Sequence, residues 1–289
     1  MGMASKRVAL TATVADLGPD LEDWCAYHLN FFGRIILWLD DHRHLSSPDL
    51  PVHPAIQALP GDQASESDRH TNCMLRQNAN ADAALRQCHA AGIEWLMHRD
   101  QDEILYPAPD HLWDKDAGQI TFLNHEVCPV WGADRLFQGG DISAATGEAT
   151  SASTRSANPR CVAGPDVLPD GAHRFTGFAG PAIIVEQPCV LHYACATYAS
   201  WLHKYRRLGE FNSYWYDDPA APISLPFHLE SRDACLSTDP SAARGFFAKH
   251  VLPESELLRL EAEGIVMRAD PLGEIPAESA RHSEPADTL

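Results

Sequence analysis

Two aspartates separated by one residue, Asp100 and Asp102, are the side chains of this sequence best suited to binding a divalent cation. Carboxylate oxygens are good ligands for Mg²⁺ and Mn²⁺, and a cation held there can stabilise the charge that develops on a diphosphate leaving group. Apolar residues flank the pair at 95–97 and at 104–105. Because solvated surface acids rarely occur inside such an apolar frame, the segment 98–103 (HRDQDE) predicts a metal site.

Further acids follow two other apolar segments. Asp40 and Asp41 come directly after residues 35–39, and Glu126 comes shortly after residues 119–124. In parallel sheets, ligands bind beyond the carboxyl ends of the strands. We therefore expect these acids to converge with the D-x-D pair at one edge of a sheet.

The elements that must position these acids alternate between strands and helices. This alternation predicts an α/β fold, in which a Rossmann-like, mixed and mostly parallel sheet is flanked by helices. The expected strands are 7–14, 35–39, 55–59, 93–97, 119–124 and 182–193, and the expected helices are 21–32, 68–91, 197–211 and 254–263. Asp20 is expected to be the N-cap of the first helix, and Gly92 is expected to end the second.

The chain is predicted to form one domain over residues 1–268. It contains a long loop, rich in Gly, Ala, Ser, Thr and Pro, at 139–171, and it ends in a polar tail at 269–289 that we expect to be disordered. No run of 18 apolar residues predicts a transmembrane helix, and no signal peptide precedes the first strand. The sequence thus favours a soluble, cytoplasmic protein, or else the catalytic domain of a longer anchored one.

Charge and cysteine content narrow the classes of function. With 40 acidic and 22 basic residues the formal net charge is −18, which disfavours binding to nucleic acid and to anionic membranes. An anionic substrate would need local positive charge, for which a divalent cation is the obvious candidate. The eight cysteines include no C-x-x-C pair, so we expect buried free thiols in a reducing compartment.

The segment 94–105 resembles the D-x-D-E signature of GT-A glycosyltransferases, in the branch of family 2-like and family 92-like enzymes. Weaker matches occur in the same order along roughly residues 7–265. They are Leu21 to Trp24 with Tyr27 and His28, residues 35–41, Gln77, Asn124 to Glu126, and His192 and Tyr193 followed by Trp201 and Lys204. One departure is clear, because the first strand of this group usually ends in K-N-E, whereas Asp16 stands here one residue out of place.

The resemblance implies a metal-dependent hexosyltransferase that moves a sugar from a nucleotide sugar, with a UDP-sugar as the expected donor, to a carbohydrate or other hydroxyl acceptor, with inversion. It implies that Asp100, Asp102 and His192 bind Mn²⁺ or Mg²⁺, although position alone favours a core role for His192. Glu126 is then the candidate general base, or else a solvated loop acid, with Asp134 and Asp141 as competitors. The donor-binding residues implied are Asp16, Asp40, Asp41, Gln77, Asp100 and Arg174.

Other side chains support weaker hypotheses. Three aromatic residues near probable loops are candidates for stacking on an acceptor sugar: Trp131, Trp215 and Tyr216. Cations beside the long loop (Arg155, Arg160 and His173, with Arg174) are either anion ligands or ordinary loop residues, and those on the helix 197–211 (Lys204, Arg206 and Arg207) are expected to be a solvated face. Two alternative functions remain open: a nucleotidyltransferase or phosphoesterase using the same carboxylates, and a non-catalytic nucleotide- or carbohydrate-binding protein.

Overall fold

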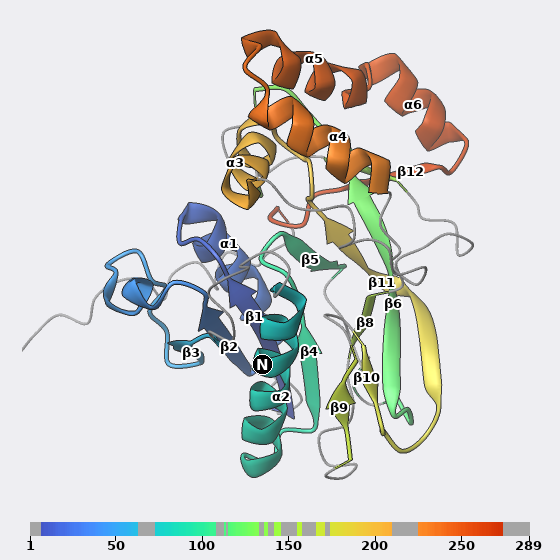
Figure 1. Cartoon of the computed structure of the whole chain (residues 1–289). Helices are drawn as coiled ribbons and strands as arrows, with labels where there is room; N and C mark the ends of the chain where they lie inside the picture. The colour runs from blue at the N-terminus through green and yellow to red at the C-terminus, as the bar shows by residue number, and fades with distance from the viewer. Residues whose placement is uncertain are drawn as a thin grey trace, which may run out of the picture.

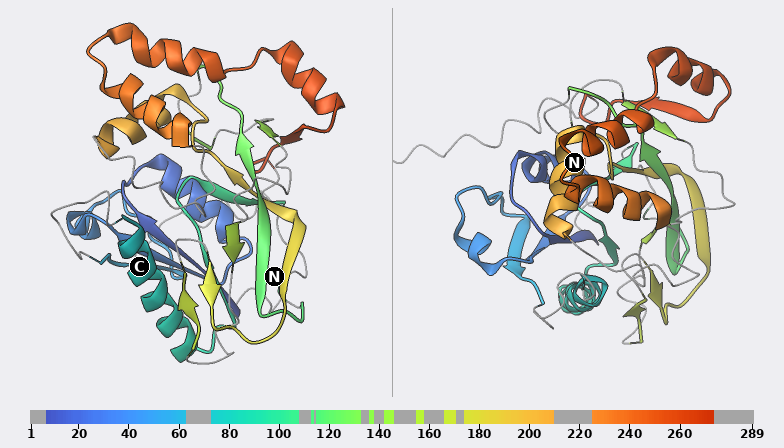
Figure 2. Two further views of the ribbon diagram at one scale, coloured as in Figure 1. Left: turned by 45° about the vertical axis from the view of Figure 1, so that its right-hand side comes forward. Right: turned by 45° about the horizontal axis from the view of Figure 1, so that its top comes forward.

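A computed structural model gives the fold of the chain. It describes residues 7–62, 73–107, 113, 115–132, 136–137, 142–145, 155–157, 166–170, 174–209 and 225–273, and the statements below refer to these residues. Two sheets form the body of the molecule, and a group of helices lies together at one end of them (Figure 1). The left view of Figure 2 shows from another side that this group lies at one end of the two sheets.

The first sheet has four parallel strands in the order β3-β2-β1-β4. They are β1 (Val8–Val14), β2 (Arg34–Leu39), β3 (Ile56–Pro60) and β4 (Trp95–His98). The two central strands are buried almost throughout, as runs of apolar, β-branched residues predict. This sheet and its helices confirm the predicted α/β class.

Helices cover both faces of the first sheet. One face packs on α2 (Cys73–Ala90) through residues such as Ala84, Cys88 and Ile36. The other face packs on α1 (Pro19–His28) and on the second sheet, in one continuous core that includes Trp24 and Leu10. Successive side chains of β1 point to opposite faces of the sheet, as in any strand, so alternate residues pack into two different cores.

The helix ends show one confirmed expectation and one wrong one. Gly92 follows α2 with a φ of +66°, the left-handed conformation that favours glycine after a helix, as predicted. Asp20 is not the N-cap of α1, because α1 starts one residue earlier and Gly18 is the cap. The Asp20 carboxylate instead accepts a hydrogen bond from the backbone N–H of Leu136, at 3.0 Å.

The second sheet is mixed and largely antiparallel, with the order β12-β7-β6-β11-β5 and β8 paired to β6. It contains β5 (Glu103–Tyr106), β6 (Gln119–Val127), β7 (Ile142–Ala145), β8 (Arg155–Ala157), β11 (Ala182–His192) and β12 (Val266–Ala269). Only β6 and β11 run parallel. A small hairpin of β9 (Leu168–Pro169) and β10 (Phe175–Thr176) lies beside it. The segments 119–124 and 182–193 were thus correctly predicted as strands, but they belong to a second sheet.

Strand β11 contains a bulge. Val185 pairs with Phe122, and the next pair joins Val190 to Asn124, so β11 advances further than β6 between the two pairs. Before the bulge the strand is half-exposed, and after it the strand is buried between β6 and β5. The bulge therefore marks the point at which β11 enters the core.

The helical group consists of α3 (Tyr198–Leu208), α4 (Leu225–Leu236), α5 (Pro240–His250) and α6 (Glu254–Ala262). Trp201, Tyr205, Phe246 and Phe247 form much of its core. The helix that we expected at 197–211 starts after the N-cap Thr197, whose side chain accepts a hydrogen bond from the backbone N–H of Ser200, and it ends at Leu208.

The loop and tail expected from composition are only partly covered by the described residues. The segment 139–171 contains β7, β8 and β9, and its other residues largely lie outside the described ranges. Strand β12 reaches Ala269 and Leu272 packs against the main core, so the first residues of the expected tail belong to the fold. Residues 274–289 lie outside the described residues.

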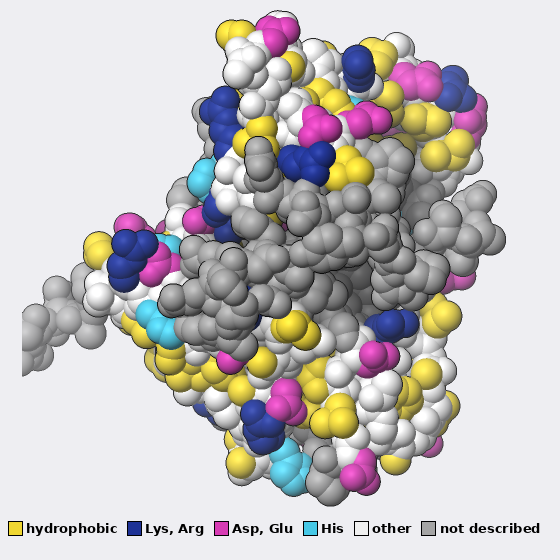
Figure 3. Space-filling model, viewed as in Figure 1, with side chains coloured by type: hydrophobic (Ala, Val, Ile, Leu, Met, Phe, Trp, Pro, Cys, Tyr) yellow, Lys and Arg dark blue, Asp and Glu magenta, His cyan; other side chains and the backbone are white. Residues whose placement is uncertain are grey.

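The described surface is mixed in character, and most of the described cysteines are buried. On the face shown in Figure 3, acidic, basic and hydrophobic side chains are interspersed. Among described cysteines, Cys25, Cys88, Cys189, Cys195 and Cys235 are buried free thiols, as expected, and Cys128 is half-buried. Burial raises the pKa of the Cys25 thiol to about 12. No helix in the described part of the chain is both long enough and apolar enough to cross a membrane.

Candidate functional site

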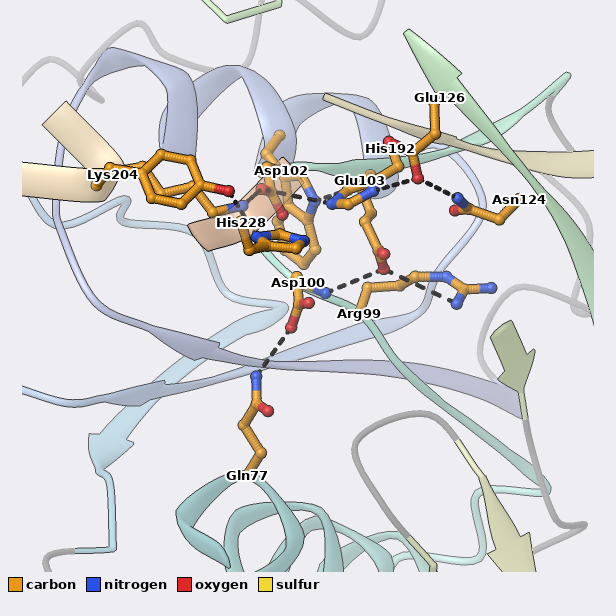
Figure 4. A network of polar contacts seen from close by, with 12 residues as sticks. Gln77, Arg99, Asp100, Asp102, Glu103, Asn124, Glu126, His192, Lys204 and His228 are labelled. Atoms are coloured by element: carbon orange, nitrogen blue, oxygen red, sulfur yellow. Dashed lines mark hydrogen bonds and ion pairs between the residues drawn. The ribbon is translucent and has the colours of Figure 1, made fainter. Parts of the chain in front are cut away.

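The D-x-D segment is a tight turn between the two sheets. Strand β4 ends at His98 and β5 begins at Glu103, so residues 99–102 turn at the carboxyl edge of the parallel sheet. Beneath the turn, the side chains of Arg99 and Glu103 are both 0% exposed, with 3.9 Å between Nη1 and Oε2. The same Glu103 oxygen accepts a hydrogen bond from the backbone N–H of Asp100, at 3.3 Å (Figure 4). A buried ion pair therefore supports the turn.

The two aspartates of the turn point to different partners (Figure 4). Gln77 of α2 donates a hydrogen bond from Nε2 to Oδ1 of Asp100, at 3.0 Å. Asp102 accepts a hydrogen bond from Nζ of Lys204 on α3, at 2.9 Å, and its Oδ2 lies 3.7 Å from Nε2 of His192. Burial opposes ionisation of Asp102, but the charges of Lys204 and His192 hold its pKa well below its usual range.

His192 lies between two carboxylates. The register of β11 and β6 places it opposite Glu126, whose Oε1 is 2.8 Å from its Nδ1. Asn124 donates a second hydrogen bond to this Oε1, at 2.7 Å. In the imidazolium form both ring nitrogens carry protons, which face Glu126 and Asp102. In the neutral form with its proton on Nδ1, bonded to Glu126, the lone pair of Nε2 is directed towards Asp102. Partial burial opposes ionisation of Glu126, but the charge of His192 and these hydrogen bonds lower its pKa.

One side of α2 contacts the carboxyl edge of the first sheet. Arg76 donates to both oxygens of Asp40, at 2.8 and 3.2 Å, in a largely buried ion pair. Asn80 donates to the Thr13 hydroxyl at 3.0 Å, and its Oδ1 accepts the backbone N–H of Asp62, at 2.8 Å. With Gln77, these side chains reach residues at or just beyond the ends of all four strands. Arg76 and Asn80 were not predicted from the sequence, although their spacing with Gln77 on an alanine-rich helix places all three on one side of it.

Asp16 lies next to the D-x-D turn. Gln101 joins the two segments, because its Oε1 accepts the backbone N–H of Ala15 at 3.0 Å and its Nε2 donates to the carbonyl of Asp16 at 3.4 Å. The Asp16 carboxylate is 3.1 Å from Nε2 of His203 and 3.1 Å from Nε of Arg207. Lys204 and Arg207 are thus partners of site carboxylates. Arg207 is exposed, as the prediction of a solvated face implies, whereas Lys204 is partly buried against Asp102.

The side chains of two predicted donor-binding residues, Asp41 and Arg174, pair with residues outside the D-x-D turn. The exposed Arg43 guanidinium pairs with Asp41, lowers the pKa of that carboxyl, and holds it at the start of a 3-10 turn. Arg174 is exposed near Asp170 and precedes Phe175, which contacts the first residue of β6. It therefore lies at the opposite end of β6 from Glu126. Other candidates lie outside the described residues: Asp134, Asp141, Arg160, His173, Trp215, Tyr216 and the side chain of Arg155.

The expected metal ligands fit a cation only in part. Over the described residues, no group of three His, Cys, Asp or Glu side chains is arranged to hold one. Asp102 and His192 are a suitable pair, since two donors that each bind an ion at about 2.1 Å lie roughly 3 to 4 Å apart. Mg²⁺ is commonly held by one or two protein ligands together with water and substrate phosphates. Asp100, bonded to Gln77, would contact the ligand rather than complete the protein's share of the shell.

Comparison with known proteins assigns the chain to no family. The chain matches no model of a known protein family, and no curated protein is significantly similar to it in sequence. The chemistry of the site therefore rests on its own residues: a carboxylate and an oriented imidazole that can share a cation, flanked by further carboxylates and by the cations of α3.

Proposed function

We propose that this protein is a metal-dependent glycosyltransferase that moves a sugar from a nucleotide-sugar donor, a UDP-sugar by resemblance, to a hydroxyl acceptor. One observation carries the proposal. At the carboxyl edge of the parallel sheet, Asp102 lies 3.7 Å from the ring nitrogen of a histidine whose other nitrogen is held by a carboxylate. Asp100 belongs to the same turn, and Gln101 of the turn donates a hydrogen bond to the carbonyl of Asp16.

The roles follow from these positions. Asp102 and His192 would hold Mn²⁺ or Mg²⁺, which supplies the positive charge that a diphosphate leaving group requires. Asp16 and Asp100 would contact the nucleotide sugar. Glu126 has two possible roles, and positioning of His192 is the better supported, because a carboxylate with a lowered pKa is a weak proton acceptor near neutral pH.

A thermal-shift screen of nucleotide sugars, with and without Mn²⁺, tests the proposal. We expect stabilisation by a uridine diphosphate sugar that requires Mn²⁺ and is lost in Asp102→Ala. Asp49→Ala, at an exposed acid outside the site, is the matched control and should behave as the wild type. Stabilisation that is unchanged in Asp102→Ala, or absent for every nucleotide, would contradict the proposal.

A non-catalytic binding protein on the same fold is the second candidate. The observation that favours it is the ion pair of Lys204 with Asp102, at 2.9 Å, which occupies an oxygen that the cation would need. Mass spectrometry of donor and acceptor mixtures separates the candidates. Sugar transfer supports the enzyme, Mn²⁺-dependent nucleotide binding without any turnover supports the binding protein, and hydrolysis or nucleotidyl transfer alone would point to a phosphoesterase or nucleotidyltransferase.

A further inference from the structure

Two cations and a histidine on one side of α3 contact carboxylates of the site. His203 and Arg207 meet Asp16, each at 3.1 Å, and Lys204 meets Asp102 at 2.9 Å. Positions 203, 204 and 207 are neighbours on a helix surface, because residues three and four apart lie one turn from each other. We call these three residues the α3 cation row.

The contacts of the row are open to exchange with a ligand. The side chains of Lys204 and Arg207 are 30% and 40% exposed, and that of Asp16 is 39% exposed. Ion pairs that solvent reaches contribute little to stability. An anion with more charge and more acceptor oxygens can therefore replace Asp16 at Arg207 without a large loss. The pair of Lys204 with Asp102 is more enclosed, because the Asp102 side chain is 16% exposed, and its exchange requires the stronger charge of a diphosphate.

The charge of the site makes such a row necessary for an anionic ligand. The chain has a formal net charge of −18, and the acids of the sheet edge would repel phosphate. Arg76, on the other side of the turn, is engaged with Asp40 through two hydrogen bonds in a largely buried pair. The α3 cation row contacts the edge through partly exposed side chains instead.

We propose that the α3 cation row binds the diphosphate of the ligand. The identity of that ligand as a nucleotide sugar rests on the proposed function. Ammonium and guanidinium groups bind phosphate oxygens through charge-assisted hydrogen bonds. In the ligand-free chain the carboxylates of Asp16 and Asp102 take the places of phosphate oxygens. Ligand binding transfers Arg207 and Lys204 to the diphosphate, which leaves Asp102 beside His192 for a cation.

Isothermal titration calorimetry of the full chain tests this with three probes: inorganic diphosphate, uridine diphosphate and uridine. Lys204→Gln and Arg207→Gln are each expected to weaken binding of both diphosphates. The affinity should fall roughly tenfold, because each variant removes one hydrogen bond between charged groups. Binding of uridine should not change. Arg206→Gln is the matched control, because Arg206 is an exposed cation on the same helix outside the row.

A variant with the opposite expected effect guards against a general loss of folding. Asp16→Asn removes the carboxylate that competes for His203 and Arg207, so it should tighten the binding of inorganic diphosphate. Weakened binding in this variant, or row variants that weaken diphosphate binding no more than Arg206→Gln does, would overturn the inference.

The outcomes also separate this inference from the proposed function. If inorganic diphosphate binds through the α3 cation row while no nucleotide sugar binds, diphosphate binding by the row is supported and the proposed function is contradicted. If uridine diphosphate binds equally well to the wild type and to the row variants, the proposed function is not contradicted, but diphosphate binding by the row is. A wild-type chain that binds neither diphosphate overturns the row directly.

Discussion

Replacing Arg99 by methionine should remove a large part of the stability of this fold. Arg99 and Glu103 are 0% exposed, and the loss of one partner leaves a charge buried in the core. Breaking such a pair costs about 3 to 5 kcal/mol, out of the roughly 5 to 15 kcal/mol by which folded proteins are stable. At about 2 to 4 °C per kcal/mol, the melting temperature should fall by roughly 6 to 20 °C.

Urea denaturation followed by circular dichroism gives the free energy of unfolding of each variant. Arg86→Met is the matched control, since Arg86 forms an exposed ion pair with Asp82 and should change stability by no more than about 0.5 kcal/mol. The double variant Arg99→Met with Glu103→Leu buries no charge and should recover part of the loss. A loss below about 1 kcal/mol in Arg99→Met, or a double variant less stable than that single one, would refute this account of the pair.

Three further predictions concern the site and its support. Glu126→Gln should weaken Mn²⁺ binding about 10- to 100-fold in calorimetry if Glu126 orients His192, whereas unchanged affinity with lost turnover would identify it as the base. Because the pKa of Asp102 is lowered in the folded state, its contribution to stability is complete above about pH 4 and disappears as pH falls through the folded pKa. Urea denaturation should show the stabilities of wild type and Asp102→Asn converging in acid, and a constant difference would contradict this. Thr197→Ala should cost about 1 kcal/mol through loss of the α3 cap, measured in the same way against Ser237→Ala.

The elements of the first sheet could be predicted because each carries a local signal. Apolar, β-branched runs predict β1 and β2, and Gly92 marks the end of α2 by its left-handed conformation. Sheet membership could not be predicted in this way. The apolar pattern of β6 and β11 fits a buried strand in either sheet, and only tertiary packing assigns both to the second one.

The part of the site that lies in one segment could be predicted from the sequence. The contacts between segments that are far apart in the chain could not. The D-x-D pair lies at the carboxyl end of a strand of the parallel sheet, as expected. The directions of Asp100 and Asp102 depend on a turn, and their partners Gln77 and Lys204 come from helices far along the chain. Lys204 was assigned to a solvated face because helical periodicity does not indicate which neighbouring carboxylate a surface cation will meet.

The bulge in β11 gives the chain a tolerance to changes in length close to the site. Beyond the bulge, the strand is fixed by pairing with two neighbours, so His192 stays opposite Glu126 and beside Glu103. The bulge residues Glu186 and Gln187 are exposed and lie between the two registers. Insertions or deletions there can be absorbed before the buried half of the strand begins. The bulge between the two paired halves of β11 can therefore vary in length, or accept an inserted peptide, while the histidine keeps its place.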